Sequence, residues 1–210
     1  MTSSEVLPFV LGLVCAYIIG SFPSGYIIGR LKKGVDIRDV GSRNMGAMNV
    51  FYSVGFKEGL LVLALDIVKG ALAVAVARLL GSPILGQLLA GAAAVLGHSY
   101  SIFLKFRGGR GGATCIGVLV FLMPLGAPFY LALFLILLGI TRFPTLSYSL
   151  AFLSFPFVGW LWYHSVAFVI FSVAILIIPG LRYISRIQEI RSKSGSWSHF
   201  FKRKSLKERL

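Results

Sequence analysis

Two glycine-rich, basic stretches of the chain contain the residue types best suited to chemistry. The first runs from Asp36 to Asn49 and the second from Lys105 to Gly112. In both, glycine lets backbone N–H groups turn toward an anion, and arginines add positive charge, from Arg38 or Arg43 in the first stretch. The second precedes a predicted helix, whose N-terminal N–H groups and dipole favour phosphate. Either stretch alone is typical of an ordinary turn, but the two together predict a shared anionic substrate.

The other candidate groups are few. His98 ends an apolar run, where a histidine is either a hydrogen-bonded structural residue or, so close to the second stretch, a functional one. No histidine is followed by an aspartate five positions later. Among only seven acidic residues, Asp36 and Asp39 are the close pair outside the apolar runs, and we expect Arg38 to neutralise them. Metal catalysis is therefore disfavoured, and we expect no metal and no cofactor.

The composition indicates which elements must position these residues. Of 210 residues, 57% are apolar and 13% are charged, and the mean hydropathy is +0.85. A soluble domain carries about 25% charged residues to cover its surface. A soluble protein is therefore excluded, and the chain is predicted to be an all-α polytopic membrane protein.

Four long runs carry no charge and can supply the spans, since about 20 apolar helical residues cross a bilayer. They are Val6–Gly29, Leu79–Leu104, Gly111–Thr141 and Phe143–Leu181. A further predicted span, about Gly59–Leu80, is interrupted by Asp66 and Lys69, which share a helix face and can neutralise one another.

The two longest runs must each be divided. Gly111–Thr141 is broken by Pro124, Gly126 and Pro128 into halves of about 20 Å, and Phe143–Leu181 contains an aromatic cluster around Trp160 that is typical of a turn at the membrane interface. If both runs cross twice, 19 of the 21 Lys and Arg residues lie on one side. The positive-inside rule then predicts about seven transmembrane helices, with the N-terminus outside and the C-terminus cytoplasmic.

The expected organisation is a seven-span membrane domain over 1–181, with cytoplasmic loops 30–57 and 105–112, followed by a basic tail over 182–210. The net charge of +14 is explained by this topology, so no nucleic-acid partner is expected. The tail either lies on anionic lipid at the inner surface or extends into solvent. Cys15 and Cys115 are expected to be small core residues rather than a disulfide or metal site.

At the level of motifs, the chain resembles the bacterial acyl-phosphate:glycerol-3-phosphate acyltransferases (PlsY). The first loop is similar to their motif Gly-Ser-x-Asn-x-Gly-Ala-x-Asn, and the second to Gly-His…Phe-Leu-x-Phe-x-Gly-Gly-Lys-Gly. Gly20–Ser24 and the Asp66, Lys69 and Gly70 positions are also similar. The matching positions in the two loops are Gly41, Ser42, Asn44, Gly46, Ala47, Asn49, Gly97, His98, Phe103, Leu104, Phe106, Gly108, Gly109, Arg110 and Gly111.

The resemblance implies a multi-pass protein of the bacterial inner membrane that moves a fatty acyl group from acyl phosphate to the 1-hydroxyl of glycerol 3-phosphate. The product would be lysophosphatidic acid, the first intermediate of phospholipid synthesis. Implied partners are the two substrates, membrane lipid and the enzyme that makes acyl phosphate. Candidate catalytic residues are Ser42, His98 and Arg110. Candidate substrate-binding residues are Gly41, Arg43, Asn44, Gly46, Asn49, Gly108, Gly109, Gly111, Thr145 and Arg182.

The chain departs from the family pattern at several positions. Arg110 replaces the usual lysine, Met48 a threonine, Tyr52 an arginine and Thr145 a serine. A C-terminal motif with His and Asn is reduced to Arg182. Two alternatives therefore stay open: a non-catalytic lipid- or partner-binding paralogue on the same scaffold, and an anion transporter or channel. The transporter is disfavoured, because the spans carry one ion pair and no file of polar residues.

Overall fold

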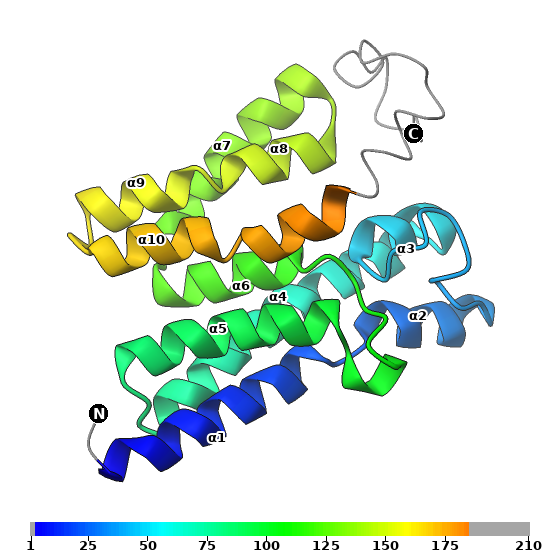
Figure 1. Ribbon diagram of the computed structural model, residues 1–210. Coiled ribbons are helices and arrows are strands. Elements are labelled where there is room, and N and C mark those ends of the chain that lie inside the picture. Colours follow the sequence, from blue (N-terminus) through cyan, green and yellow to red (C-terminus); the bar gives the residue numbers. More distant parts are fainter. Residues whose placement is uncertain (1–2, 185–210) are drawn as a thin grey trace. The chain divides into compact units, whose positions relative to one another are not determined.

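The structure is a computed structural model that describes residues 3–184, and these residues are helical without any β-strand (Figure 1). The basic tail beyond Ile184 lies outside the described residues. The helices are α1 (Ser3–Gly20), α2 (Ser24–Lys33), α3 (Ala47–Ser53), α4 (Phe56–Leu79), α5 (Ile84–Ser99), η1 (Ile102–Leu104), α6 (Gly112–Leu122), α7 (Gly126–Thr141), α8 (Pro144–Ala151), α9 (Ser154–Leu161) and α10 (Val166–Ala174). Residues 177–184 are again helical.

The chain divides into two compact units, and the boundary along the sequence lies between Leu122 and Met123. In the first unit, α1 packs against α4 and α5, and α4 also packs against α3 and α6. Between α1, α4 and α5 the buried core consists of the small residues Ala16, Ala73, Ala77, Ala90 and Ala94. Small side chains let helix backbones approach closely, which is how helices associate within a bilayer.

The first apolar run is not one continuous helix. It is interrupted at Ser21–Pro23, because proline has no N–H to continue the hydrogen-bond ladder. The second piece, α2, ends at Gly34, whose positive φ of 67° is a typical helix C-cap. The first apolar run therefore forms two helices, and the short second one, α2, leads directly into the first glycine-rich loop.

A second buried cluster lies against the first glycine-rich loop and includes the last residue of η1. It consists of Ile28, Ile37, Met45, Val50, Val62 and Leu104. These side chains come from α2, the first loop, α3, α4 and η1, so the first loop packs against the segment that leads into the second loop. Within the predicted loop 30–57, residues 47–53 form the short helix α3, because Val50 packs into this apolar cluster.

The second unit contains α7 to α10. Tyr130, Phe152 and Phe155 stack at its centre, with ring centroids 5.3–6.3 Å apart. Residues 162–165 leave the helix between α9 and α10, and Trp162 packs on Phe129 there. The chain therefore turns at the predicted aromatic cluster, and the predicted break at Pro124 is confirmed.

Four helical segments in the described part of the chain are long and apolar enough to cross a membrane. They are Glu5–Lys33, Phe56–Leu79, Ile84–Leu104 and Val166–Ile184. Gly112–Leu122 and Gly126–Thr141 are apolar but shorter. The all-helical fold is thus confirmed.

Candidate functional site

The first loop is organised around the side chain of Asn49, which is buried at the start of α3. Its amide nitrogen donates to the carbonyl oxygens of Ile37, Val40 and Asn44 at 2.8–3.0 Å. Its amide oxygen accepts from the Ser42 N–H at 2.9 Å. Asn49 therefore fixes the conformation of the loop through hydrogen bonds to its backbone, and both its amide nitrogen and its amide oxygen take part in these bonds.

Gly41 and Arg43 are the exposed residues of this turn, on either side of Ser42. Their φ angles are 59° and 55°, so the chain passes twice through the left-handed region that favours glycine. A Cβ at Gly41 would overlap Asn49 Oδ1, so glycine is required there for space as well as for conformation. The turn thus presents the Arg43 side chain outward, while Ser42 and Asn44 are half-buried.

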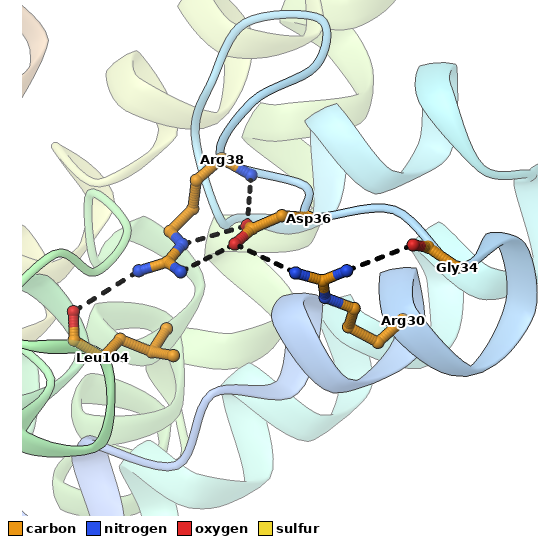
Figure 2. A network of polar contacts seen from close by, with 5 residues as sticks. All are labelled: Arg30, Gly34, Asp36, Arg38 and Leu104. Atoms are coloured by element: carbon orange, nitrogen blue, oxygen red, sulfur yellow. Dashed lines mark hydrogen bonds and ion pairs between the residues drawn. The ribbon is translucent and has the colours of Figure 1, made fainter.

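A polar network joins the first loop to η1, the short helix just before the second loop (Figure 2). The Arg38 guanidinium donates to both oxygens of Asp36, at 3.0 and 2.7 Å, and its Nη1 donates to the Leu104 carbonyl oxygen at 3.4 Å. The hydrogen bonds from Arg38 hold the pKa of Asp36 below its ordinary value, and Asp36 in turn raises the pKa of Arg38. Arg38 therefore forms an ion pair with Asp36, as expected, and neutralises the charge of this carboxylate.

Arg30 joins this network from α2. Its guanidinium lies 3.8 Å from Asp36 Oδ2 and donates to the Gly34 carbonyl oxygen. Arg30 and Arg38 both lie over the Tyr26 ring, at 5.5 and 5.2 Å from its centroid. Arg30 and Arg38 are thus held by the Asp36 carboxylate and by the face of the Tyr26 ring. Arg43 is the first-loop arginine that points outward.

The second loop folds back on the end of α5. The N–H groups of Gly108 and Gly109 donate to the carbonyl oxygens of Ser99 and His98, at 3.2 and 3.0 Å. Cβ atoms at these glycines would overlap His98. Gly111, at φ 89°, brings the chain into the first turn of α6, so the expected order of glycine loop and helix is confirmed.

Four N–H groups in the two loops, those of Ser42, Arg43, Gly108 and Gly109, make hydrogen bonds within the protein. They donate to Asn49, Val40, Ser99 and His98, respectively. The physical reason is that folded loops satisfy their own backbone donors before any ligand arrives. The cationic side chains and the first turn of α6 remain as candidate anion contacts.

His98 is buried, with 2% of its side chain exposed. Its Nδ1 lies 3.2 Å from Thr114 Oγ1 and 3.6 Å from Asp66 Oδ1. Asp66 also accepts from Ser24 Oγ at 2.6 Å and pairs with Lys69 at 2.8 Å. The predicted Asp66–Lys69 pairing is confirmed.

Sequence reasoning missed the remainder of this cluster. An acid within an apolar span was a signal that a functional or structural partner exists. The pattern did not show which residues from other helices would supply it, because Ser24 and Thr114 are ordinary small polar residues in the sequence.

The candidates Gly41–Asn49, His98 and Gly108–Gly111 all belong to the first unit, and His98 lies against Gly108 and Gly109. Thr145 and Arg182 belong to the second unit, where Thr145 occupies the first turn of α8. Nearby, Thr141 Oγ1 and Ser147 Oγ are 2.9 Å apart. In the described residues, no three His, Cys, Asp or Glu side chains gather as a metal site, and Cys15 and Cys115 are both free thiols.

Comparisons with known proteins match nearly the whole chain. The family described as glycerol-3-phosphate acyltransferase matches residues 10–193. A protein named glycerol-3-phosphate acyltransferase 2 from Dehalococcoides mccartyi is 53% identical over 209 residues, covering 99% of this chain and 100% of that protein. The glycerol-3-phosphate acyltransferase of Bacillus subtilis is 50% identical over 135 residues, which are 64% of this chain and 69% of that protein.

Solved structures agree with this assignment. The crystal structure of PlsY (YgiH), an integral membrane glycerol 3-phosphate acyltransferase in its glycerol 3-phosphate form, superposes with a TM-score of 0.79. It is 32% identical, and the match covers 88% of this chain and 92% of that one. The lysophosphatidic acid form gives a TM-score of 0.77 at 31% identity. The chain is therefore a membrane protein, and it belongs to the glycerol-3-phosphate acyltransferase family of enzymes.

Proposed function

We propose that this protein transfers a fatty acyl group from acyl phosphate to the 1-hydroxyl of glycerol 3-phosphate, forming lysophosphatidic acid as the first step of phospholipid synthesis. The observation that carries the proposal is the contact of the basic first loop with η1, the segment that leads directly into the basic second loop, through Arg38 and a common apolar cluster. The relatives solved with glycerol 3-phosphate and with lysophosphatidic acid support the acceptor and the product.

The reaction needs little from the protein beyond placement and charge. The 1-hydroxyl oxygen forms a bond to the acyl carbon, the bond from that carbon to the phosphate oxygen breaks, and inorganic phosphate leaves with the electron pair. The hydroxyl proton passes to a phosphate oxygen of the substrates. An acyl phosphate is already activated, so holding the two substrates together and stabilising the developing charge account for the catalysis.

We assign the roles from the environment of each residue. Arg43 and Arg110 bind phosphate through their side chains, together with Ser42, Asn44 and the first turn of α6 after Gly111. The glycines at 41, 46, 108 and 109 provide space and conformation for the loops. Asn49 and His98, both buried, act by positioning these groups. Thr145 and Arg182 are proposed as further substrate contacts.

The proposed setting is a seven-span protein of the bacterial inner membrane, with both loops on the cytoplasmic side. α6, α7, residues 144–161 and residues 166–184 would then supply the last four crossings. Glycerol 3-phosphate reaches such a site from the cytosol, and the acyl chain from the bilayer. A membrane-associated enzyme that makes acyl phosphate is the expected supplier of the donor.

Arg110 offers the most direct test of this proposal. Purified protein in detergent is incubated with radiolabelled glycerol 3-phosphate and palmitoyl phosphate or palmitoyl-CoA, and the labelled lipid is quantified. We expect lysophosphatidic acid from palmitoyl phosphate, a loss of roughly 100-fold or more in Arg110→Ala, and a loss within about tenfold in Arg110→Lys, which keeps the charge. Arg78→Ala, an exposed arginine at the end of α4, is the matched control and should be unchanged.

Each other outcome has a definite meaning. Product formed from palmitoyl-CoA but not from palmitoyl phosphate would replace the proposed donor. A folded wild type that gives no product with either donor would favour the non-catalytic paralogue, as the replacement of the family's arginine by Tyr52 would then suggest.

A further inference from the structure

A buried ion pair in the middle of α4 meets the break between α1 and α2. The side chains of Asp66 and Lys69 are 1% and 5% exposed. Lys69 Nζ donates to the Phe22 carbonyl oxygen at 2.9 Å, just beyond the end of α1. Asp66 Oδ1 accepts from Ser24 Oγ at 2.6 Å, at the start of α2. The cation therefore lies at a helix C-terminus and the anion at a helix N-terminus, the arrangement that helix dipoles favour.

The same carboxylate reaches the second loop through His98. Asp66 Oδ1 lies 3.6 Å from His98 Nδ1, which also contacts Thr114 Oγ1 on α6. On its other side, the ring lies against the glycine turn, since a Cβ on Gly109 would overlap His98 Nε2. The imidazole is thus fixed between Asp66, α6 and the second loop.

A link in the other direction runs to the first loop. α2 begins at the break and leads into that loop, and a Cβ on Gly25 would overlap the Met45 carbonyl oxygen. A displacement of the start of α2 would therefore be transmitted to the backbone of the first loop. The ion pair contacts the structure that supports each loop.

Stability alone does not explain these residues. Asp66 Oδ2 is buried and has no hydrogen-bond partner among the described residues. An orphaned buried oxygen is costly, and apolar replacements of buried ion pairs are often as stable as the original pair. Charge neutrality in the membrane would require Asp66 and Lys69 only to face each other, without contacts to Phe22, Ser24 and His98.

We infer that Asp66, Lys69 and His98 are positioning residues for acyl transfer, which fix the glycine turn of the second loop relative to α2 and the first loop. The inference rests on the proposed function for its catalytic consequence. The inference also predicts that these residues set the distance between the two loops, and this distance can be measured in an inactive protein.

The first experiment separates positioning by His98 from chemistry at its ring. His98→Asn keeps an amide near the position of Nδ1, whereas His98→Gln moves the amide toward Nε2. If Nδ1 positions the loop, the kcat of His98→Asn stays within a few-fold of wild type, and that of His98→Gln falls roughly 10- to 100-fold at nearly unchanged KM. If Nε2 instead takes part in the reaction, His98→Asn loses as much activity as His98→Gln, which overturns the inference for His98.

The second experiment tests the orientation of the ion pair. The exchange variant Asp66→Lys/Lys69→Asp keeps a neutral pair but places each charge at the wrong helix end. The inference predicts a fall in kcat of at least roughly tenfold. Wild-type kcat in the exchange variant would show that neutrality is sufficient, and would overturn the role of the pair.

The third experiment measures the loops directly by electron–electron resonance, and does not need activity. Nitroxide labels are placed at Asp39→Cys and Arg107→Cys, both exposed, after Cys15 and Cys115 are replaced by alanine. We expect a narrow distance distribution in this parent, a shifted or broadened one on adding Asp66→Asn or His98→Gln, and no change on adding Glu58→Gln, the matched acid at the start of α4.

The outcomes remain separable from those of the proposed function. An unchanged distance in both Asp66→Asn and His98→Gln overturns the inference, whether or not the wild type is active. A wild type without activity on either donor overturns the proposed function, and the distance measurement still decides whether the cluster positions the loops.

Discussion

Asn49 shows how one amide can define a loop. An amide offers two N–H hydrogens and an acceptor oxygen, and Asn49 uses both kinds of group, toward three carbonyl oxygens and toward the Ser42 N–H. A carboxylate has nearly the same shape but cannot donate. The conformation of the first loop therefore depends on the nitrogen of this side chain.

The variant Asn49→Asp should lower the free energy of unfolding by about 3 kcal/mol, since bonds to three carbonyl oxygens are replaced by repulsion at about 1 kcal/mol each. Thermal or denaturant unfolding in detergent measures the change. Ser53→Ala removes a single 3.3 Å contact to the same side chain and should cost less than about 1 kcal/mol. Equal stability of Asn49→Asp and wild type would show that the loop is held by other contacts.

At the scale of elements, the Asp36–Arg38 pair connects the first loop to η1. Because Arg38 holds the pKa of Asp36 below its ordinary value of 3.8, the pair contributes stability above about pH 4. That contribution is lost as the pH falls through the lowered pKa and Asp36 becomes protonated.

We expect Asp36→Asn to have a lower melting temperature than wild type near pH 7. The loss in free energy of unfolding should be less than about 1 kcal/mol, because the pair is partly exposed to solvent. The difference between the two proteins should close as the pH falls below about 4 and through the lowered pKa of Asp36. Melting curves of both proteins across this range provide the measurement. A difference that is constant with pH would mean that the carboxylate charge is not involved.

The α1–α5 contact depends on close backbone approach. A Cβ at Gly20 would overlap the backbone of Ala94, so Gly20→Ala should destabilise the protein by about 1–3 kcal/mol through overpacking. Gly139→Ala in α7 is the matched control, because a Cβ there meets nothing within 4 Å. The control should be neutral or slightly stabilising in the same unfolding assay, and a neutral Gly20→Ala would mean that the two helices can separate without cost.

Much of this arrangement was predictable from the sequence, and the limit is a physical one. Long apolar runs, the break near Pro124 and the Asp66–Lys69 pair follow from local patterns. Contacts such as Asp66 with His98 do not, because they join helices whose relative rotation is set by packing. Asn49 illustrates the same limit: a loop asparagine can face inward or outward, and only the folded neighbours decide between the two.

At the scale of the whole molecule, the distribution of positive charge is the strongest topological signal. The proposed seven-span topology puts 19 of 21 Lys and Arg residues on the cytoplasmic side. This arrangement requires the short apolar helices α6 and α7 to cross as separate spans, although α6 is about 16 Å long. The sides of the connecting turns therefore test the topology directly.

Single cysteines at Asp39, Leu80, Arg107 and His164, in a background without Cys15 and Cys115, report those sides. A membrane-impermeant maleimide added to intact cells should label positions 80 and 164, and should reach 39 and 107 only after permeabilisation. Cell-surface labelling at position 39 or 107 would reverse the orientation. Labelling of 164 only after permeabilisation would reduce the number of crossings.

The broken first span also bears on how the chain is made. Ser24 precedes Asp66 by 42 residues, and Phe22 precedes Lys69 by 47. At a synthesis rate of about 5–20 residues per second, the polar groups at the break wait several seconds for their partners. Hydrocarbon does not tolerate unsatisfied backbone groups, so the nascent first span must stay hydrated at the insertion machinery until α4 arrives. Only then can the first span be released into the lipid.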